Sequence, residues 1–245
     1  NTVMKHLKQV KRVIHMAMSF GYLDRDPFDG HKTTYKETNR GFLTMDDLDR
    51  LVSHEFNIKR LDVVRDIFVF ACYTGLSYSD LPALTRRNIM KGDDGKDWIV
   101  YERQKTGVKA SIPLLPPAKA IMEKYKDHRE CLKTGTLLPV RSDQKLNAYL
   151  QEITDICGLS RRPTMHVARH TFATTVTLSN GVHMETVQKM LGHAMIKTTQ
   201  FYSKVLLNKI SEEMENVRQR LFKEPAESME SKRVSDTLPF KPSLN

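Results

Sequence analysis

Residues 61–73, with the sequence LDVVRDIFVFACY, are almost all apolar and form a run long enough for a helix. A helix that is apolar on every side is buried on every side. The run therefore predicts a central helix with other elements packed around it, and Gly75 is placed to end that helix. Hydrophobic residues make up 40% of the 245 positions, which is enough to build the surrounding core.

An amphipathic segment occupies the start of the chain. Its apolar residues recur every three or four positions from Val3 to Ala17, and basic residues fill the other face. The segment ends near Gly21. Because it begins without a capping residue, we expect residues 1–28 to be the last helix of a truncated N-terminal part. Residues 29–43 are polar and aperiodic, which indicates a linker.

The main body is expected to begin at Thr44. Thr44 and Asp47 have the spacing of a capping box, with Asp in place of Glu. Apolar residues of the helix that follows would face the core: Leu48, Leu51 and Val52. After the central helix, a second, short helix is expected over residues 77–84.

Three short strands are expected next, at 88–90, 98–104 and 110–114. A Gly-Asp-Asp-Gly turn and a Lys105-Thr106-Gly107 turn separate them, so they predict a small antiparallel sheet. Beyond it the pattern is helical, over 117–129, 143–157, 166–180, 183–191 and 204–222. Residues 223–245 indicate a C-terminal tail. The fold class is therefore α+β and mostly helical, with one domain over residues 44–222.

The net charge of the chain is +10 at pH 7, and half of it lies between Gly158 and Lys204, where six Lys or Arg accompany one acid, Glu185. Such a stretch indicates an anion-binding face. The sequence has no run of about 20 apolar residues, so we expect no membrane span. Three widely spaced cysteines favour neither a disulfide framework nor a zinc site, and a reducing cytoplasm is the expected compartment.

A group of motifs lies within the basic stretch. His166 and Arg169 are three residues apart, a spacing that places both on one face of a helix. Arginine suits two non-bridging phosphate oxygens, and histidine can transfer a proton near neutral pH. Leu191-Gly192-His193 and then Tyr202 follow. Each motif alone is weak, because a solvated helix face or a core tyrosine is commoner, but their order and spacing together are hard to obtain by chance.

With these motifs, residues 44–222 resemble the catalytic domain of the tyrosine recombinases, also named the phage integrase family. The resemblance implies that residues 1–28 are the C-terminal helix of a truncated core-binding domain. Residues 74–81, TGLSYSDL, resemble the first box of that family, and 166–174 with 191–202 resemble the second. The resemblance implies that Tyr202 is the nucleophile, with His166 and Arg169 as the His-x-x-Arg pair. It assigns two further active-site residues, the second histidine and the lysine of the β-hairpin: His193 and Lys105.

One position departs from the family pattern, because Ser77 stands where the family usually has arginine after Thr-Gly-Leu. Arg103 is the candidate replacement. It lies two residues before Lys105 on the same expected strand, so both side chains would point to the same side of the sheet. An exposed strand residue is the alternative for Arg103. Integrases of conjugative transposons are similar in lacking that arginine, which makes this subgroup the preferred assignment.

The resemblance implies an enzyme that cleaves and rejoins DNA strands through a 3′-phosphotyrosyl intermediate, to integrate and excise a mobile element. A tyrosine hydroxyl has a pKa of about 10 and needs help to lose its proton. His166 would be the base, and Lys105 would protonate the departing 5′ oxygen. The phosphate would be stabilised by Arg169, His193 and Arg103. The bond energy stays in the phosphotyrosyl link, so neither ATP nor a metal or other cofactor is expected.

Two other functions stay open: a type IB topoisomerase, which shares this chemistry, and a catalytically impaired DNA-binding module, because Ser77 removes one family residue. Double-stranded DNA is the expected partner, and the family pattern implies a tetramer on DNA, with accessory DNA-bending proteins as further partners. Basic residues near the motifs are candidates for additional phosphate contacts, although each could equally be a solvated charge: Arg86, Arg87, Arg161, Arg162 and Lys204.

Overall fold

The structure is a computed structural model that describes residues 1–32, 34, 41–200, 202, 214–215 and 217–218. The chain divides into two compact units, Asn1–Gly41 and Phe42–Asn245. The expected helix 204–222 is described only at 214–215 and 217–218, and the expected tail 223–245 lies outside the described residues. Within the described ranges, no helix is both long enough and apolar enough to cross a membrane.

The described part of the first unit contains the helix α1 (Thr2–Ser19), as the apolar periodicity predicts. No residue of this helix is buried. Lys11 Nζ donates to the carbonyl of His31 at 2.6 Å, and His15 Nε2 lies 3.2 Å from Asp26 Oδ2. These contacts hold the segment that follows the helix against the helix itself.

The second unit begins at Phe42, inside the segment that the sequence indicates as a linker. Leu43 has 0% of its surface exposed. Its N–H donates to Thr171 Oγ1 at 3.0 Å, and its carbonyl accepts a hydrogen bond from Thr175. The chain is therefore anchored in the core before Thr44, because an apolar side chain in a polar segment finds a buried place there.

The helix α2 (Met45–Ser53) starts with the expected capping box, in which the side chains of Thr44 and Asp47 each accept the other's backbone N–H. Leu48 and Leu51 are buried as predicted. Val52 is 47% exposed, so the prediction for this residue is wrong. It lies in the last turn of α2, one residue before the helix ends at Ser53.

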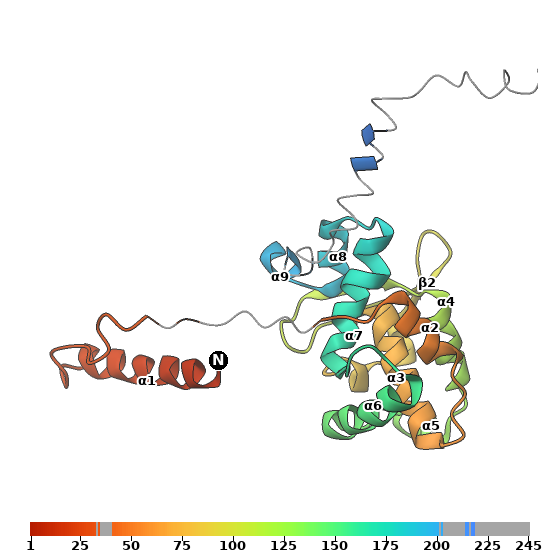
Figure 1. The fold of residues 1–245 in the computed structure, drawn as a ribbon, viewed down its shortest axis with the longest axis horizontal. Coiled ribbons are helices and arrows are strands. Elements are labelled where there is room, and N and C mark those ends of the chain that lie inside the picture. Colours follow the sequence, from red (N-terminus) through yellow and green to blue (C-terminus); the bar gives the residue numbers. More distant parts are fainter. Residues whose placement is uncertain (33, 35–40, 201, 203–213, 216, 219–245) are drawn as a thin grey trace, which may run out of the picture. The chain divides into compact units, whose positions relative to one another are not determined.

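The central helix is α3 (Lys59–Thr74), as the apolar run predicts, and Gly75 ends it with a φ of 68°. Phe68 and Phe70 are fully buried in it. The helices that pack against α3 include α2, α4 (Pro116–Lys124), α6 (Asp143–Cys157) and α7 (Met165–Thr171). Figure 1 shows α3 and α7 in the middle of this unit.

The predicted three-stranded antiparallel sheet is confirmed, with β1 (Ile89–Lys91), β2 (Asp97–Glu102) and β3 (Lys109–Pro113) in that order. β2 ends two residues earlier than the expected 104. Ile99 and Tyr101 are the buried residues of β2, so one face of the sheet joins the core. The helix α8 (Met184–Leu191) packs against β3 and brings the sheet next to the basic stretch.

Two expected helices differ in their ranges, and two further helical segments are not expected from the sequence. The expected helix 77–84 contains only a 3₁₀ turn, η1 (Leu81–Ala83), because Pro82 has no N–H for a longer helical ladder. The expected helix 117–129 ends at Lys124, and a separate helix α5 (Arg129–Thr134) follows. The polar segment after His193 contains α9 (Ile196–Gln200), and a further 3₁₀ turn, η2 (Arg86–Asn88), precedes β1.

The expected helix 166–180 changes its hydrogen-bond pattern along its length. α7 passes into a π-helical segment, η3 (Phe172–Thr177), and then into a 3₁₀ turn, η4 (Leu178–Asn180). Thr177 Oγ1 donates to the carbonyl of Phe172 at 3.0 Å and to that of Ala173 at 2.7 Å. A threonine hydroxyl that bonds such carbonyls disturbs the regular helix ladder, which composition and periodicity do not indicate.

Candidate active site

Arg169 lies on α7 with 3% of its surface exposed. Its Nη1 donates to the carbonyl of Gly75 at 2.6 Å and its Nη2 to the carbonyl of Leu191 at 2.5 Å. These carbonyls lie at the C-terminal ends of α3 and α8, where a helix dipole is negative. Two helix ends therefore hold the buried guanidinium in a fixed orientation. Burial, followed by the charge of Arg103, lowers the pKa of Arg169.

Two glycines allow this close approach. Gly75 and Gly192 end α3 and α8 with φ values of 68° and 59°, in the left-handed region that favours glycine. A Cβ on Gly75 would lie 2.4 Å from the ring of Phe172, and a Cβ on Gly192 would lie 2.7 Å from Cδ of Arg103. The glycine of the Leu-Gly-His motif thus makes room for Arg103.

Tyr202 is 6% exposed and lies among histidine rings. The ring of His170 is in edge contact with it, with the centroids 5.0 Å apart, and the ring of His193 is nearly parallel to it at 6.3 Å. Burial raises the pKa of the Tyr202 hydroxyl, and Arg169 and Arg103 oppose that rise. The hydroxyl is therefore protonated at neutral pH and needs a base before it can act as a nucleophile.

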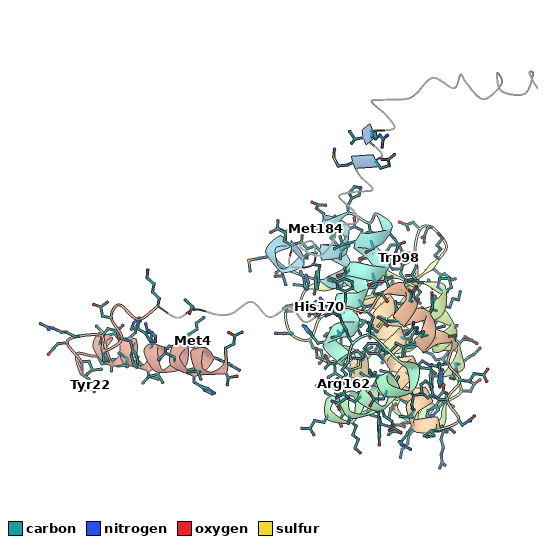
Figure 2. All side chains as sticks on the ribbon, viewed as in Figure 1. Met4, Tyr22, Trp98, Arg162, His170 and Met184 are labelled. Carbon is teal, nitrogen blue, oxygen red and sulfur yellow. The ribbon has the colours of Figure 1, made fainter. Side chains whose placement is uncertain are left out.

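His166 is exposed, and its ring packs edge-on against that of His170 at a centroid distance of 4.6 Å. His170 contacts the rings of both His166 and Tyr202, and it lies on α7 in Figure 2. The sequence motifs assign no role to His170, which lies within the basic stretch 158–204. Its spacing of four residues from His166 is the feature that predicts two neighbouring rings on one helix face.

His193 follows directly after Gly192, and its Nδ1 lies 2.9 Å from Oγ1 of the buried Thr199. Burial, and then the charges of Arg169 and Arg103, lower the pKa of His193 to about 4. The imidazole is therefore neutral at pH 7. It can offer a hydrogen bond to an anion, but it contributes no positive charge.

Arg103 lies directly after β2 and is only 9% exposed, so the alternative of an exposed strand residue is wrong. Its Nη1 donates to the carbonyl of Gly192 at 3.2 Å. Its charge acts on the pKa values of Arg169, His193 and Tyr202. Arg103 therefore belongs to the same cluster as three residues that the motifs select.

Asp80 connects the position of the missing family arginine to Arg103. Ser77 Oγ donates to Asp80 Oδ2 at 2.6 Å, and Asp80 Oδ1 accepts the N–H of Gln104 at 3.1 Å. Arg103 Nε lies 3.8 Å from Asp80 Oδ2. Asp80 is buried, with 2% of its surface exposed. Arg169, Arg103 and Asp80 together carry two positive charges and one negative charge. Their surplus of +1 suits an anionic ligand.

The sequence predicts that Lys105 and Arg103 point to the same side of the sheet, and for Lys105 this prediction is wrong. β2 ends at Glu102, and residues 104–106 form a turn. The alternation of a strand therefore does not extend to Lys105. Arg103 is buried in the site, whereas Lys105 is exposed.

The candidates for further phosphate contacts are exposed where they are described, which fits both a DNA contact and a solvated charge: Arg86, Arg87, Arg161 and Arg162. Lys204 lies outside the described residues. Arg86 and Arg87 line a hollow of about 470 Å³. Arg162 Nη2 lies 3.6 Å from Asp155 Oδ1, and Figure 2 shows Arg162 near α6.

The sequence argument assigns no role to Tyr101, although it is buried beside this cluster. The charges of Arg169, Asp80 and Arg103 all act on the pKa of its hydroxyl. A tyrosine at a buried strand position is the usual core residue, so only the fold reveals its neighbours. Within the described part of the chain, no group of three or more His, Cys, Asp or Glu side chains could hold a metal ion.

Known proteins resemble the chain over most of its length. A sequence model of the phage integrase family matches residues 41–209. The tyrosine recombinase XerD of Oceanobacillus iheyensis is 29% identical over 219 residues, which are 83% of this chain and 71% of XerD.

Solved structures show a similar fold. The Tn1549 transposon integrase in complex with circular intermediate DNA has a TM-score of 0.63 at 17% identity, over 87% of this chain and 80% of that one. The XerH site-specific recombinase bound to a difH substrate has a TM-score of 0.57 at 20% identity, over 71% of this chain. The chain spans 52% of that XerH chain, about half of its length.

Proposed function

Because the chain belongs to the phage integrase family of tyrosine recombinases, we propose that it cleaves and rejoins DNA strands through a covalent bond to Tyr202. The observation that carries the proposal is the convergence of Tyr202, Arg169 and Arg103 in one buried, positively charged site. The three motifs that support the proposal lie within a span of 36 positions, from His166 to Tyr202.

In the cleavage step, Tyr202 Oη attacks phosphorus, and the bond from phosphorus to the 5′ oxygen breaks. The tyrosine proton passes to a histidine base, which we assign to His166, and the departing 5′ oxygen takes a proton from Lys105. The products are a 3′-phosphotyrosyl link and a free 5′ hydroxyl. Attack by the 5′ hydroxyl of another strand reverses every bond change and releases Tyr202.

Charge that develops on the phosphate is stabilised by oriented donors. Arg169 is held by two carbonyls before any substrate arrives, so its reorganisation on binding is small. We assign the Thr199 hydroxyl as the donor to His193 Nδ1, which leaves the ring proton on Nε2 to bond a phosphate oxygen. Arg103 supplies the second positive charge in place of the arginine that Ser77 lacks.

The partner in this proposal is double-stranded DNA. The Tn1549 integrase and XerH have been solved with DNA, which supports that choice. Recombination between two duplexes requires a tetramer, and accessory DNA-bending proteins are further expected partners. The activity would integrate and excise a mobile element, as in integrases of conjugative transposons. All three cysteines are free thiols, which fits a reducing cytoplasm.

The test is covalent capture on a nicked duplex that carries the junction sequence of the element encoding the protein. We expect a protein–DNA adduct that survives denaturant with the natural protein and none with Tyr202→Phe. Tyr149→Phe is a matched control, because that ring packs against Arg60 rather than in the site. An adduct that persists in Tyr202→Phe would contradict the assignment of the nucleophile.

A catalytically impaired DNA-binding module is the second candidate, and Ser77 is the observation that favours it. Such a protein binds the nicked duplex but forms no adduct. A type IB topoisomerase instead relaxes supercoiled DNA that lacks the junction sequence. All three share phosphate contacts, so binding weakens steeply as salt concentration rises in each case.

A further inference from the structure

Tyr101 places a hydroxyl group inside the charged cluster from a strand rather than from a motif. It lies on β2, opposite Ala110 of β3. Its side chain belongs to the core, and 6% of its surface is exposed. The same site therefore receives groups from the sheet, from α7 and from the end of α8.

The Tyr101 hydroxyl has no hydrogen bond of good geometry to any described residue, although it is fully buried. Arg103 Nε is also buried and also lacks a hydrogen bond to the described residues. A buried polar atom without a partner is unfavourable in a folded protein, so such atoms are rare and usually mark a place where a ligand or water binds. The Tyr101 hydroxyl and Arg103 Nε are two such atoms, and both lie near the buried guanidinium of Arg169. They indicate that a ligand with hydrogen-bond acceptors binds in this site.

The charges around the hydroxyl specify the kind of group that would bind there. Burial and Asp80 raise the pKa of Tyr101, and Arg169 and Arg103 only partly oppose them. The hydroxyl therefore keeps its proton at neutral pH and is a donor. Arg169, near enough to act on the same hydroxyl, is also a donor only. An oxygen anion accepts hydrogen bonds from both.

We propose that the Tyr101 hydroxyl donates a hydrogen bond to a non-bridging oxygen of the scissile phosphate, beside Arg169. Tyr101 is then a second tyrosine of the active site, which binds the phosphate and keeps its proton throughout, while Tyr202 attacks. This inference rests on the proposed strand-cleavage function and adds a phosphate ligand to it.

Tyr101→Phe tests the inference because it keeps the ring and removes only the hydroxyl. We expect adduct formation on the nicked duplex to slow by about 10-fold to 100-fold, the range for loss of one hydrogen bond to a charged group. Without DNA, the variant should unfold at the same temperature as the natural protein or at a higher one, because it removes an unpaired buried hydroxyl. Slower cleavage with undiminished stability is a result that a purely structural tyrosine does not give.

Tyr125→Phe is the matched control. The hydroxyl of Tyr125 is also buried, but it donates to Asp66 Oδ2 at 2.8 Å, away from the site. We expect this variant to unfold at a lower temperature and to cleave DNA at the natural rate. Equal cleavage rates for Tyr101→Phe and the natural protein would overturn the inference.

A modified substrate locates the hydrogen bond. A methylphosphonate at the scissile position replaces one non-bridging oxygen with a methyl group, and two stereoisomers exist. We expect the defect of Tyr101→Phe to disappear on one isomer, because the accepting oxygen is then absent, and to persist on the other. An equal defect on both isomers would overturn the proposed contact. No adduct with natural protein and natural phosphate would contradict the proposed function itself, and the inference with it.

Discussion

Arg65 and Arg169 are both buried arginines of the second unit, with 8% and 3% of their surfaces exposed, but their surroundings differ. Arg65 Nη2 donates to Asp62 at 2.6 Å and its Nε to Asp66 at 2.7 Å. Lys124 Nζ lies within 2.8 Å of both carboxylates. Two cations thus meet two anions. Beside Arg169 lies a second cation, Arg103, and the carboxylate of that cluster, Asp80, is 3.8 Å from Arg103.

The difference separates a group that completes the fold from one that is prepared for a ligand. Each charge of the Arg65 network has an opposite charge in contact, so the network is neutral without any further partner. The Arg169 cluster has an excess positive charge and unpaired donors in the free protein. Four experiments on these two regions test this difference.

The largest effect is expected from Arg65→Met. The substitution keeps much of the buried volume but leaves Lys124 as the one cation of the network beside Asp62 and Asp66. Removing one partner of a buried ion-pair network costs about 3–5 kcal/mol of unfolding free energy. Urea denaturation measures the loss, and the cleavage rate per folded molecule should stay unchanged. Unfolding free energy equal to that of the natural protein would contradict the structural role of the network.

Arg169→Lys should reduce the cleavage rate strongly and the unfolding free energy only a little. Lysine keeps the charge but lacks the planar fork that donates to Gly75 and Leu191 together. We expect cleavage of the nicked duplex to slow by about 10²–10³-fold, as for loss of an oriented donor. The change in unfolding free energy should be smaller than for Arg65→Met. A stability loss as large as that of Arg65→Met, with natural cleavage, would erase the distinction between the two regions.

Arg103→Ala tests whether the second cation replaces the arginine that Ser77 lacks. We expect cleavage to slow by about 10–100-fold, because a charge-assisted contact to the phosphate is lost. Lys109→Ala is the matched control, since Lys109 is an exposed basic residue on the adjoining strand β3. Adding Ser77→Arg to Arg103→Ala should restore part of the rate. Near-natural rates in Arg103→Ala would remove Arg103 from the site.

The sequence predicts those parts of the fold that depend on local patterns. The apolar run gives the central helix, the capping box gives the start of α2, and the turns give the order of the strands. The linker boundary is harder to predict, because the burial of Leu43 depends on Thr171 and Thr175, which are distant in the sequence. Thr177 opens a helix into a π-helical segment by a side-chain contact that periodicity does not indicate.

The candidate site is predictable where motifs exist and unpredictable where tertiary contacts decide. His193, Arg169 and Tyr202 lie together, as their order and spacing suggest. Arg103 reaches the same place for a different reason from the predicted one, because it follows the end of β2 rather than alternating with Lys105. Tyr101 belongs to no motif. Its buried hydroxyl is recognised as part of the site only because the guanidinium groups of Arg169 and Arg103 lie near it in the folded chain.

The smallest expected effect concerns the pH dependence of stability. Burial, and then the positive charges of Arg169 and Arg103, lower the pKa of His193 to about 4, below the value of about 6.5 in an unfolded chain. Between these values the unfolded state binds more protons, so unfolding free energy is fully present above pH 6.5 and falls as the pH drops towards 4. His193→Gln cannot titrate, and its unfolding free energy should fall less over this window, by on the order of 1 kcal/mol once the exposed part of the ring is allowed for. Urea denaturation at a series of pH values measures the slope. Parallel curves for the variant and the natural protein would contradict a lowered pKa of His193 in the folded protein.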